Sequence, residues 1–379
     1  MKKQIWILIL IVVVIIVGLI IFVPKSKKQV VEKKTIKIGA IYQETGSGAD
    51  WGANAEKGIK LAVEKINSEG GINGRMLQVV YEDSKSNAAD ALTAMNKLLS
   101  IDKVNIVFSQ QSGVVVALSP IANSNEVILM DTGATTPLYT SANDFTFRTS
   151  YNATYFANEV VSYLNKKEIK TAGVLYVNNE YGLSMFNAYR KNFAGQMIVV
   201  ENFSENSVDF RTQLQKIKNA NPQVFLFVAD PKQAGIIIKQ KRELGFNAPS
   251  YSDTYSVEYQ SFLDIAGDSA EGIIYVSPLY NVSRTDATFK EFNEKFQQKY
   301  NEVSNPLSAQ AYDGVMIMAF AMEQCKNFQD SECLKNKLFG VKDFMGVIGK
   351  IIFDETGEVL ERPTKLKTIK NGQFVPYEE

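Results

Sequence analysis

Short apolar runs alternate with stretches of helical period along most of this chain, and this alternation restricts the fold more than any other feature. The clearest case is Val104–Pro137, VNIVFSQQSGVVVALSPIANSNEVILMDTGATTP. The runs VNIVF and VILM are rich in β-branched residues and predict two strands, while SGVVVALSPIANSN places apolar residues at helical spacing. A strand, a helix and a second strand in this order indicate a βαβ unit with parallel strands.

The same alternation forms two series, one from Ile36 and one from about Tyr151. The predicted strands are 36–42, 76–82, 104–108, 127–130, 145–148, 172–177, 197–201, 224–229 and 273–276. The predicted helices, besides the one in Val104–Pro137, are 52–68, 88–100, 157–165, 181–193, 210–219, 233–244, 286–300 and 307–325. A hairpin-like piece, IGKIIFDETGEVLE, precedes the tail KLKTIKNGQFV. We therefore predict an α/β protein with parallel sheets covered by helices on both faces.

Turns of small hydroxyl residues follow both strands of Val104–Pro137. They are Ser109-Gln-Gln-Ser112-Gly113 and the six residues from Asp131 to Thr136. In an open parallel sheet, ligands bind outside the carboxyl ends of the strands, where helix N-termini present free N–H groups. Ser112 and Thr135 would each add a hydroxyl donor, which suits a small carboxylate. The alternative for both residues is a helix cap.

The composition excludes several classes of function. Histidine is absent from all 379 residues, which excludes His-based triads, His general bases and the usual zinc sites. The first 34 residues hold seven Lys and one acid, which leaves 34 basic and 40 acidic residues for the remainder. A mildly acidic body argues against nucleic acid as a partner, because binding phosphates needs a basic surface. We expect no catalytic residue, no metal and no cofactor.

Cysteine chemistry is left with two alternatives. The chain has two cysteines, Cys325 and Cys333, and no CxxC motif. A local disulfide between the end of one helix and the start of the next fits an oxidising compartment. Two free thiols are the other interpretation.

The segment Ile5–Val23, IWILILIVVVIIVGLIIFV, is an uncharged apolar run of about the length that spans a bilayer. No small-residue cleavage site follows it, so we predict an uncleaved membrane anchor at residues 1–23 that contacts lipid through residues 5–23. Residues 24–35 form a charged tether. Lysines lie on both sides of the span, so the positive-inside rule does not orient it.

The chain resembles a known family in the joint order of several motifs. Residues 36–98, from IKIGAIYQETGSGADWG to NAADALTAMNKL, resemble the opening of type I periplasmic binding proteins, most of all the leucine/isoleucine/valine-binding branch. Similar features follow in order: the SQQSG and DTGATTP turns, NEYG at 179–182, IAGDSAEGIIYVSP at 265–278, and the ending FDETGEV…KNGQF. The resemblance covers essentially all of residues 36–379.

The resemblance implies two doubly wound parallel-sheet lobes joined by a three-segment hinge that closes on a ligand. We place the crossings near Ser150, Ser277 and Glu361. Lobe 1 is then 36–150 with 277–361, and lobe 2 is 151–276 with 362–379.

The resemblance also implies site residues. Ser112 and Thr135 match the hydroxyls that hold the α-carboxylate of the ligand, together with the backbone of Gly133 and Ala134. Trp51 falls where the family places an aromatic ring over the ligand side chain.

The second-lobe contacts follow the family less closely. Tyr181 matches the aromatic residue that closes on the ligand. The acid that binds the ligand amine should lie in SYSDTYSV, but ungapped alignment places Tyr255 there. Asp253, two residues earlier, is the candidate for this role, and Asp230 is the reserve.

These observations predict an extracytoplasmic substrate-binding protein that captures a small, branched-chain-like amino acid and delivers it to the permease of an ABC transporter. One alternative is a membrane-anchored sensor of the same fold without a permease. Another is a different ligand, such as an amide or an aromatic acid, because this fold hosts many functions.

A third alternative is a nucleotide-dependent enzyme, because Gly46, Gly48 and Gly52 form a G-x-G-x-x-x-G pattern between a strand and a helix. The first glycine comes four residues after Tyr42 rather than in a tight turn, and Trp51 would crowd the helix start. Both features disfavour a pyrophosphate site.

Overall fold

The computed structural model describes residues 35–280, 286–360 and 363–378. Among these residues, no helix is both long enough and apolar enough to cross a lipid bilayer. The predicted membrane anchor at residues 5–23 lies outside the described residues, as does all but the last residue of the predicted tether.

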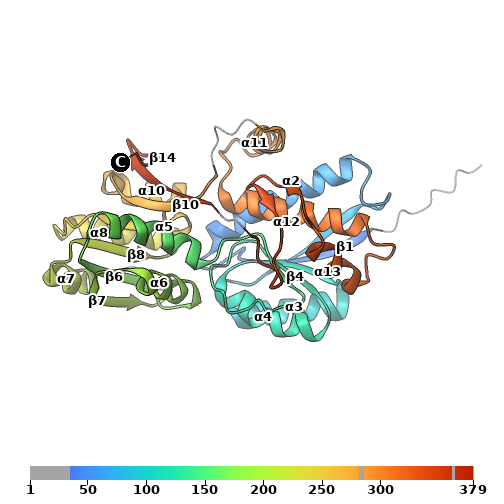
Figure 1. Cartoon of the computed structure of the whole chain (residues 1–379), viewed down its shortest axis with the longest axis horizontal. Coiled ribbons are helices and arrows are strands. Elements are labelled where there is room, and N and C mark those ends of the chain that lie inside the picture. The colour runs from blue at the N-terminus through green and yellow to red at the C-terminus, as the bar shows by residue number, and fades with distance from the viewer. Residues whose placement is uncertain (1–34, 281–285, 361–362, 379) are drawn as a thin grey trace, which may run out of the picture. The chain divides into compact units, whose positions relative to one another are not determined.

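Two sheets form the framework of the protein (Figure 1). The first has the order β2 (Leu77–Asp83), β1 (Ile36–Tyr42), β3 (Ile106–Ser109), β4 (Ile128–Asp131) and β5 (Thr146–Arg148), and these neighbours are parallel. The second has the order β14 (Gln373–Pro376), β13 (Thr364–Lys370), β10 (Ile274–Pro278), β9 (Ser250–Asp253), β8 (Val224–Val228), β6 (Thr171–Val177) and β7 (Gln196–Phe203). The predicted α/β class with two series of strands and helices is confirmed.

The prediction of parallel strands is wrong at one edge of the second sheet. Strand β13 pairs antiparallel with β10, and β14 pairs antiparallel with β13. Asn371 and Gly372 join the two edge strands with φ angles of 52° and 68°, the left-handed geometry that two-residue hairpin loops require. We interpreted KLKTIKNGQFV as a tail, although Asn-Gly between two such runs is a strong hairpin signal.

Helices follow most strands and cover the sheets. They are α2 (Ala49–Ser68), α3 (Ala88–Lys97), α4 (Ser112–Ser124), α5 (Ala153–Lys166), α6 (Glu180–Asn192), α7 (Arg211–Ala220), α8 (Pro231–Glu243), α9 (Thr254–Val257), α10 (Gln260–Ala266), α11 (Ala287–Tyr300), α12 (Pro306–Glu323) and α13 (Ser331–Phe339). A π-helical turn (Leu98–Asp102), a 3-10 turn (Gly267–Ala270) and the short pair β11 (Phe344–Met345) and β12 (Lys350–Ile351) complete the described elements. Helix α5 begins four residues earlier than predicted, because the side chain of Asn152 caps it by accepting from the N–H of Thr154.

Strand β9 and the helices α9, α10 and α13 are among the elements that were not predicted from the sequence. The segment SYSDTYSV, where the amine-binding acid was expected, forms the strand β9 followed by the short helix α9. All four residues of β9 are buried, and β9 pairs with β8 and β10. A strand of four mostly polar residues has no apolar periodicity in the sequence. Only its pairing between β8 and β10 identifies it as a strand.

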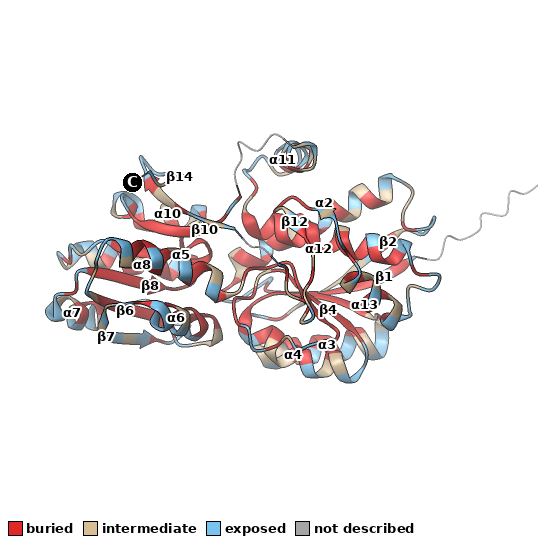
Figure 2. Ribbon diagram, in the orientation of Figure 1, coloured by how far each residue is buried: buried red, intermediate tan, exposed pale blue. Residues whose placement is uncertain are grey.

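Both faces of the first sheet are buried. In β1, Ile38 and Ala40 belong to the large apolar cluster that includes α2, whereas Ile41 belongs to the cluster formed with α3 and α4. Figure 1 shows α2 and α12 on one side of this sheet and α3 and α4 on the other, and the strands are mostly buried in Figure 2. This arrangement is expected for a doubly wound parallel sheet.

Helix α12 lies beside α2, although the two are far apart in the sequence (Figure 1). Gly58 permits this approach, because a Cβ at that position would lie 2.0 Å from the carbonyl oxygen of Ser308. The start of α12 is fixed by a capping box between Asn305 and Ser308. This packing places the first turns of α12 over the first sheet.

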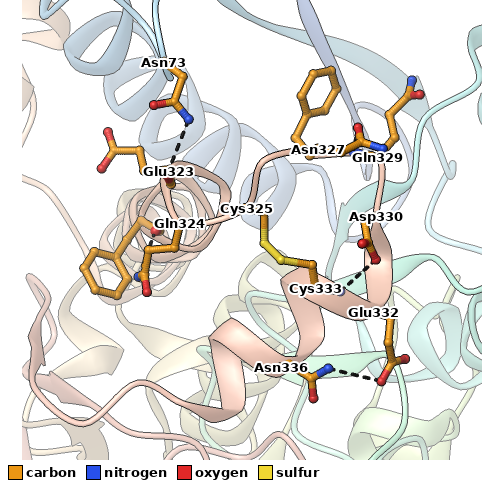
Figure 3. The surroundings of a disulfide bond; sticks show 12 residues. Asn73, Glu323, Gln324, Cys325, Asn327, Gln329, Asp330, Glu332, Cys333 and Asn336 are labelled. Carbon is orange, nitrogen blue, oxygen red and sulfur yellow. Dashed lines mark hydrogen bonds between the residues drawn. A yellow bond between two sulfur atoms is a disulfide. The ribbon is translucent and has the colours of Figure 1, made fainter.

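A disulfide joins Cys325, just after the end of α12, to Cys333 in the first turn of α13 (Figure 3). The carboxylate of Asp330 caps α13 by accepting from the N–H of Cys333 at 2.9 Å. Of the two alternatives left open for the cysteines, the structure contains the disulfide.

Candidate ligand-binding site

A small cavity lies where turns from both sheets meet. It is lined by Trp51, Gln110, Gln111, Ser112, Gly133, Tyr181, Tyr255 and Leu307. The turns that supply most of these residues follow the carboxyl ends of β3, β4, β6 and β9. This is the place where open parallel sheets bind ligands. Its free volume of about 10 Å³ is room for about one water molecule, so the cavity of this structure must widen to hold an amino acid.

The structure brings Ser112 and Thr135 together, as predicted for a shared site. Both are buried, and their hydroxyl oxygens lie 3.3 Å apart. The hydroxyl oxygen of Ser112 also accepts from the N–H groups of Thr135 at 3.2 Å and Thr136 at 3.3 Å. Because these two amides occupy its acceptor side, the hydroxyl hydrogen of Ser112 remains to be donated.

The backbone of Gly133 and Ala134 has a partner within the protein. Both N–H groups donate to one carboxylate oxygen of Asp131, at 3.0 and 2.8 Å. The other carboxylate oxygen accepts from Tyr139 at 2.5 Å and from Ser150. Burial raises the pKa of Asp131, and the nearby Arg148 opposes this shift. Sequence analysis did not single out Asp131, although an Asp before Thr-Gly is a known turn former.

Three aromatic residues line the cavity together with Ser112. The rings of Trp51 and Tyr181 meet edge to face with centroids 5.5 Å apart. The indole N–H of Trp51 donates to the carbonyl oxygen of Tyr255 at 2.9 Å. Trp51 comes from α2, whereas Tyr181 and Tyr255 come from α6 and α9 of the other lobe. The predicted aromatic residues are therefore together at the cavity.

Asp253 does not line the cavity. Its carboxylate accepts from the hydroxyl of Tyr181 at 2.8 and 2.9 Å, from the N–H of Tyr255 at 2.9 Å and from the hydroxyl of Ser256 at 3.3 Å. Burial raises the pKa of Asp253 to about 6, although these hydrogen bonds oppose the shift. In this structure Asp253 caps α9 and holds the Tyr181 ring in place.

Asp230 differs from Asp253, because neither of its carboxylate oxygens has a hydrogen bond of ordinary geometry from any described residue. It follows β8, is 2 % exposed and does not line the cavity. Burial raises its pKa to about 7, with a smaller lowering by the hydroxyl of Ser47. A buried carboxylate with so little compensation favours its protonated form.

The two lobes also meet directly beside the cavity. The hydroxyl of Thr135 lies 3.0 Å from that of Ser184, and the hydroxyl of Thr136 donates to Glu180 at 2.7 Å. These contacts join the turn after β4 to the start of α6. The residues predicted for the carboxylate thus lie at the boundary between the lobes.

Sequence analysis quoted the SQQSG turn but gave no role to its glutamines. Gln110 and Gln111 both line the cavity, and both are hydrogen-bonded to Gln43, the residue after β1. Leu307 of α12 was also missed. The signal available for Gln110 and Gln111 was their position directly after a buried strand.

The glycines of the dinucleotide-like pattern have packing roles. A Cβ at Gly52 would lie 2.0 Å from the carbonyl oxygen of Gln43. Gly46 has a φ of 92°, and the N–H of Gly48 donates to the hydroxyl of Ser86 at 3.0 Å. These contacts bring the start of α2 against the end of β1.

An α/β protein of two lobes, with a cavity between the carboxyl ends of its sheets, has the architecture of a type I periplasmic binding protein. A sequence model of the periplasmic binding protein family matches residues 35–373, and the chain belongs to this family. The family consists of substrate-binding proteins rather than enzymes.

Individual proteins similar to this chain agree with that assignment. The leucine-, isoleucine-, valine-, threonine- and alanine-binding protein of Pseudomonas aeruginosa is 26 % identical, over 91 % of this chain and 90 % of its own length. The crystal structure of the branched-chain amino acid transporter substrate-binding protein LivJ from Streptococcus pneumoniae, in complex with isoleucine, has a TM-score of 0.83 and 29 % identity, and the match covers 90 % of this chain and 98 % of LivJ. The leucine-binding protein LivK of Thermotoga maritima has a TM-score of 0.83 at 22 % identity over 91 % of this chain and 98 % of LivK, which shows the shared fold.

Proposed function

We propose that this protein captures a small, branched-chain-like amino acid between its lobes outside the cytoplasm and delivers it to the permease of an ABC transporter. The observation that carries the proposal is the cavity lined by Ser112, Trp51 and Tyr181. Thr135 does not line it, but its hydroxyl oxygen lies 3.3 Å from that of Ser112. The names of the relatives support the same class of ligand.

The hydroxyl pair suits a carboxylate. Ser112 lies at the first residue of α4, so the free N–H groups and the positive end of the helix dipole are beside it. Its hydroxyl is left as a donor by the two amides that it accepts from. We assign the α-carboxylate of the ligand to Ser112 and Thr135. The predicted backbone donors Gly133 and Ala134 are not included, because both N–H groups donate to Asp131.

The aromatic wall suits an apolar side chain. Trp51, Tyr181 and Leu307 present apolar surface to the cavity. Trp51 is held by its indole N–H and Tyr181 by Asp253, so neither ring has to be ordered when a ligand binds. The predicted acids Asp253 and Asp230 do not line the cavity, and the proposal assigns neither of them to the ammonium group.

A thermal-shift panel of amino acids, amides and nucleotides tests the ligand class. A ligand at a hundred times its dissociation constant adds about 2.7 kcal/mol to the free energy of unfolding. We expect a branched-chain amino acid to give the largest shift, and Ser112→Ala with Thr135→Ala to abolish it. An unchanged shift in the double variant would mean that the ligand binds elsewhere.

The proposal includes the lobe boundaries given above, the membrane anchor at residues 5–23 and an extracytoplasmic position of the binding lobes. Retention of the protein in membranes after alkaline extraction tests the anchor, and its release would contradict it. Delivery to a permease is tested by the uptake of the bound amino acid, which should fall when the gene is deleted.

A further inference from the structure

Three glutamines form a chain of hydrogen bonds beside the cavity. The side-chain amide nitrogen of Gln111 donates to the carbonyl oxygen of Ser86 at 3.3 Å. The amide nitrogen of Gln43 donates to the amide oxygen of Gln111 at 3.0 Å. The amide nitrogen of Gln110 donates in turn to the amide oxygen of Gln43 at 2.7 Å.

The direction of this chain is fixed by its last acceptor. A backbone carbonyl can only accept, so Gln111 must present its nitrogen to Ser86 and its oxygen to Gln43. Gln43 must therefore present its nitrogen to Gln111 and its oxygen to Gln110. Gln110 is left with its nitrogen towards Gln43 and its oxygen at the free end.

The free end lies at the cavity. Gln110 lines the cavity, is 1 % exposed, and its side-chain oxygen has no hydrogen-bond partner among the described residues. This oxygen is 2.9 Å from the point where a Cβ of Gly133 would stand, and Gly133 lines the same cavity. A buried acceptor without a donor carries a cost in free energy that a ligand donor removes.

We propose that the side-chain oxygen of Gln110 accepts a hydrogen bond from the ammonium group of the ligand. The proposal rests on the proposed amino acid function, and it replaces the acid expected from the resemblance by a neutral amide. Asp253 already accepts from Tyr181, Tyr255 and Ser256, whereas the oxygen of Gln110 is unpaired at the cavity wall.

The position beside Gly133 favours the ammonium over the side chain of the ligand. Ser112 and Thr135 hold the carboxylate in the proposed function, and Gly133 is two residues before Thr135 in the same turn. The ammonium of an α-amino acid is separated from its carboxylate by one carbon, so it must lie next to that turn. A 2-oxo acid of the same shape lacks this donor and leaves Gln110 unpaired.

The experiment compares L-leucine with 4-methyl-2-oxopentanoate, which differs from it at the α-position, by titration calorimetry on the full chain. The variant Gln110→Met should bind L-leucine about 10-fold to 100-fold more weakly, as expected for loss of a hydrogen bond to a charged group. Its affinity for the 2-oxo acid should change much less, so the preference for L-leucine falls. Gln110→Glu keeps an acceptor at the cavity but loses the N–H that Gln43 accepts, so it should retain the preference for L-leucine at a lower stability.

Two controls separate this proposal from the function on which it rests. Gln297→Met, the same change at an exposed glutamine that does not line the cavity, should leave the preference for L-leucine over the 2-oxo acid unchanged. The double variant Ser112→Ala with Thr135→Ala should lose both ligands. An unaltered preference in Gln110→Met would overturn the role of Gln110 alone. Failure of the wild-type chain to bind L-leucine would overturn both proposals.

Discussion

Gly133 is a position where a single added atom would press on two residues that line the cavity. A Cβ there would lie 2.8 Å from the Cδ2 atom of Leu307 and 2.9 Å from the side-chain oxygen of Gln110. Both neighbours line the cavity, so any displacement that relieves the clash changes its wall. Glycine is needed here for space and not for a special backbone conformation.

We therefore expect Gly133→Ala to weaken binding of L-leucine by about 10-fold or more, because overpacking at such sites costs about 1–3 kcal/mol. Gly113→Ala is the matched control, since a Cβ at Gly113 would meet no atom within 4 Å. Calorimetric titration of both variants measures the difference. Equal affinities would show that the space over Gly133 is not used by the ligand.

At the scale of elements, the disulfide holds the end of α12 against the start of α13. The cysteines are eight residues apart, so the bond closes a short loop. Closure of a loop this short should stabilise the folded chain by about 2–3 kcal/mol, chiefly by restricting the unfolded state. The cavity receives Leu307 from the opposite end of α12.

The double variant Cys325→Ala with Cys333→Ala should therefore lower the free energy of unfolding by about 2–3 kcal/mol and leave ligand affinity unchanged. Urea denaturation and calorimetric titration measure the two quantities. The wild-type chain under reducing conditions is the control and should match the variant. A stability equal to that of the oxidised wild type would contradict the prediction.

The elements differ in how far the sequence alone could predict them. Apolar strands such as β1 and β8 were predicted almost to the residue, because their period and turn residues are local signals. Strand β9 was missed, since its four residues are made a strand by pairing with β8 and β10. The same distinction applies to the site. Ser112 and Thr135 lie in turns that the sequence marks, whereas the side-chain oxygen of Gln110 becomes unpaired only through contacts with Gln43, which is distant in sequence.

At the scale of the whole molecule, two buried acids link folding to pH. Burial raises the pKa of Asp230 to about 7 and that of Asp253 to about 6, from an ordinary value of 3.8. At a pH above the ordinary pKa of 3.8 and below the raised pKa values, the unfolded chain has lost these protons while the folded chain still holds them. The contribution of both groups to stability is therefore greatest at low pH and falls as pH rises towards their folded pKa values.

Asp230→Asn isolates the larger of these contributions, because an amide keeps the shape and does not titrate. Near pH 4 the variant and the wild type should be similarly stable, since Asp230 is protonated in the folded chain. As pH rises to about 7, the free energy of unfolding of the variant should increase relative to that of the wild type by about 1.4 kcal/mol for each pKa unit of the shift, and the difference should then level off.

The exposed Asp268→Asn is the control and should show no such rise. Urea denaturation at intervals between about pH 4 and about pH 8 gives both profiles. A constant difference between Asp230→Asn and the wild type across that range would show that the Asp230 carboxylate is compensated in the folded chain, and that ionising it costs the protein no stability.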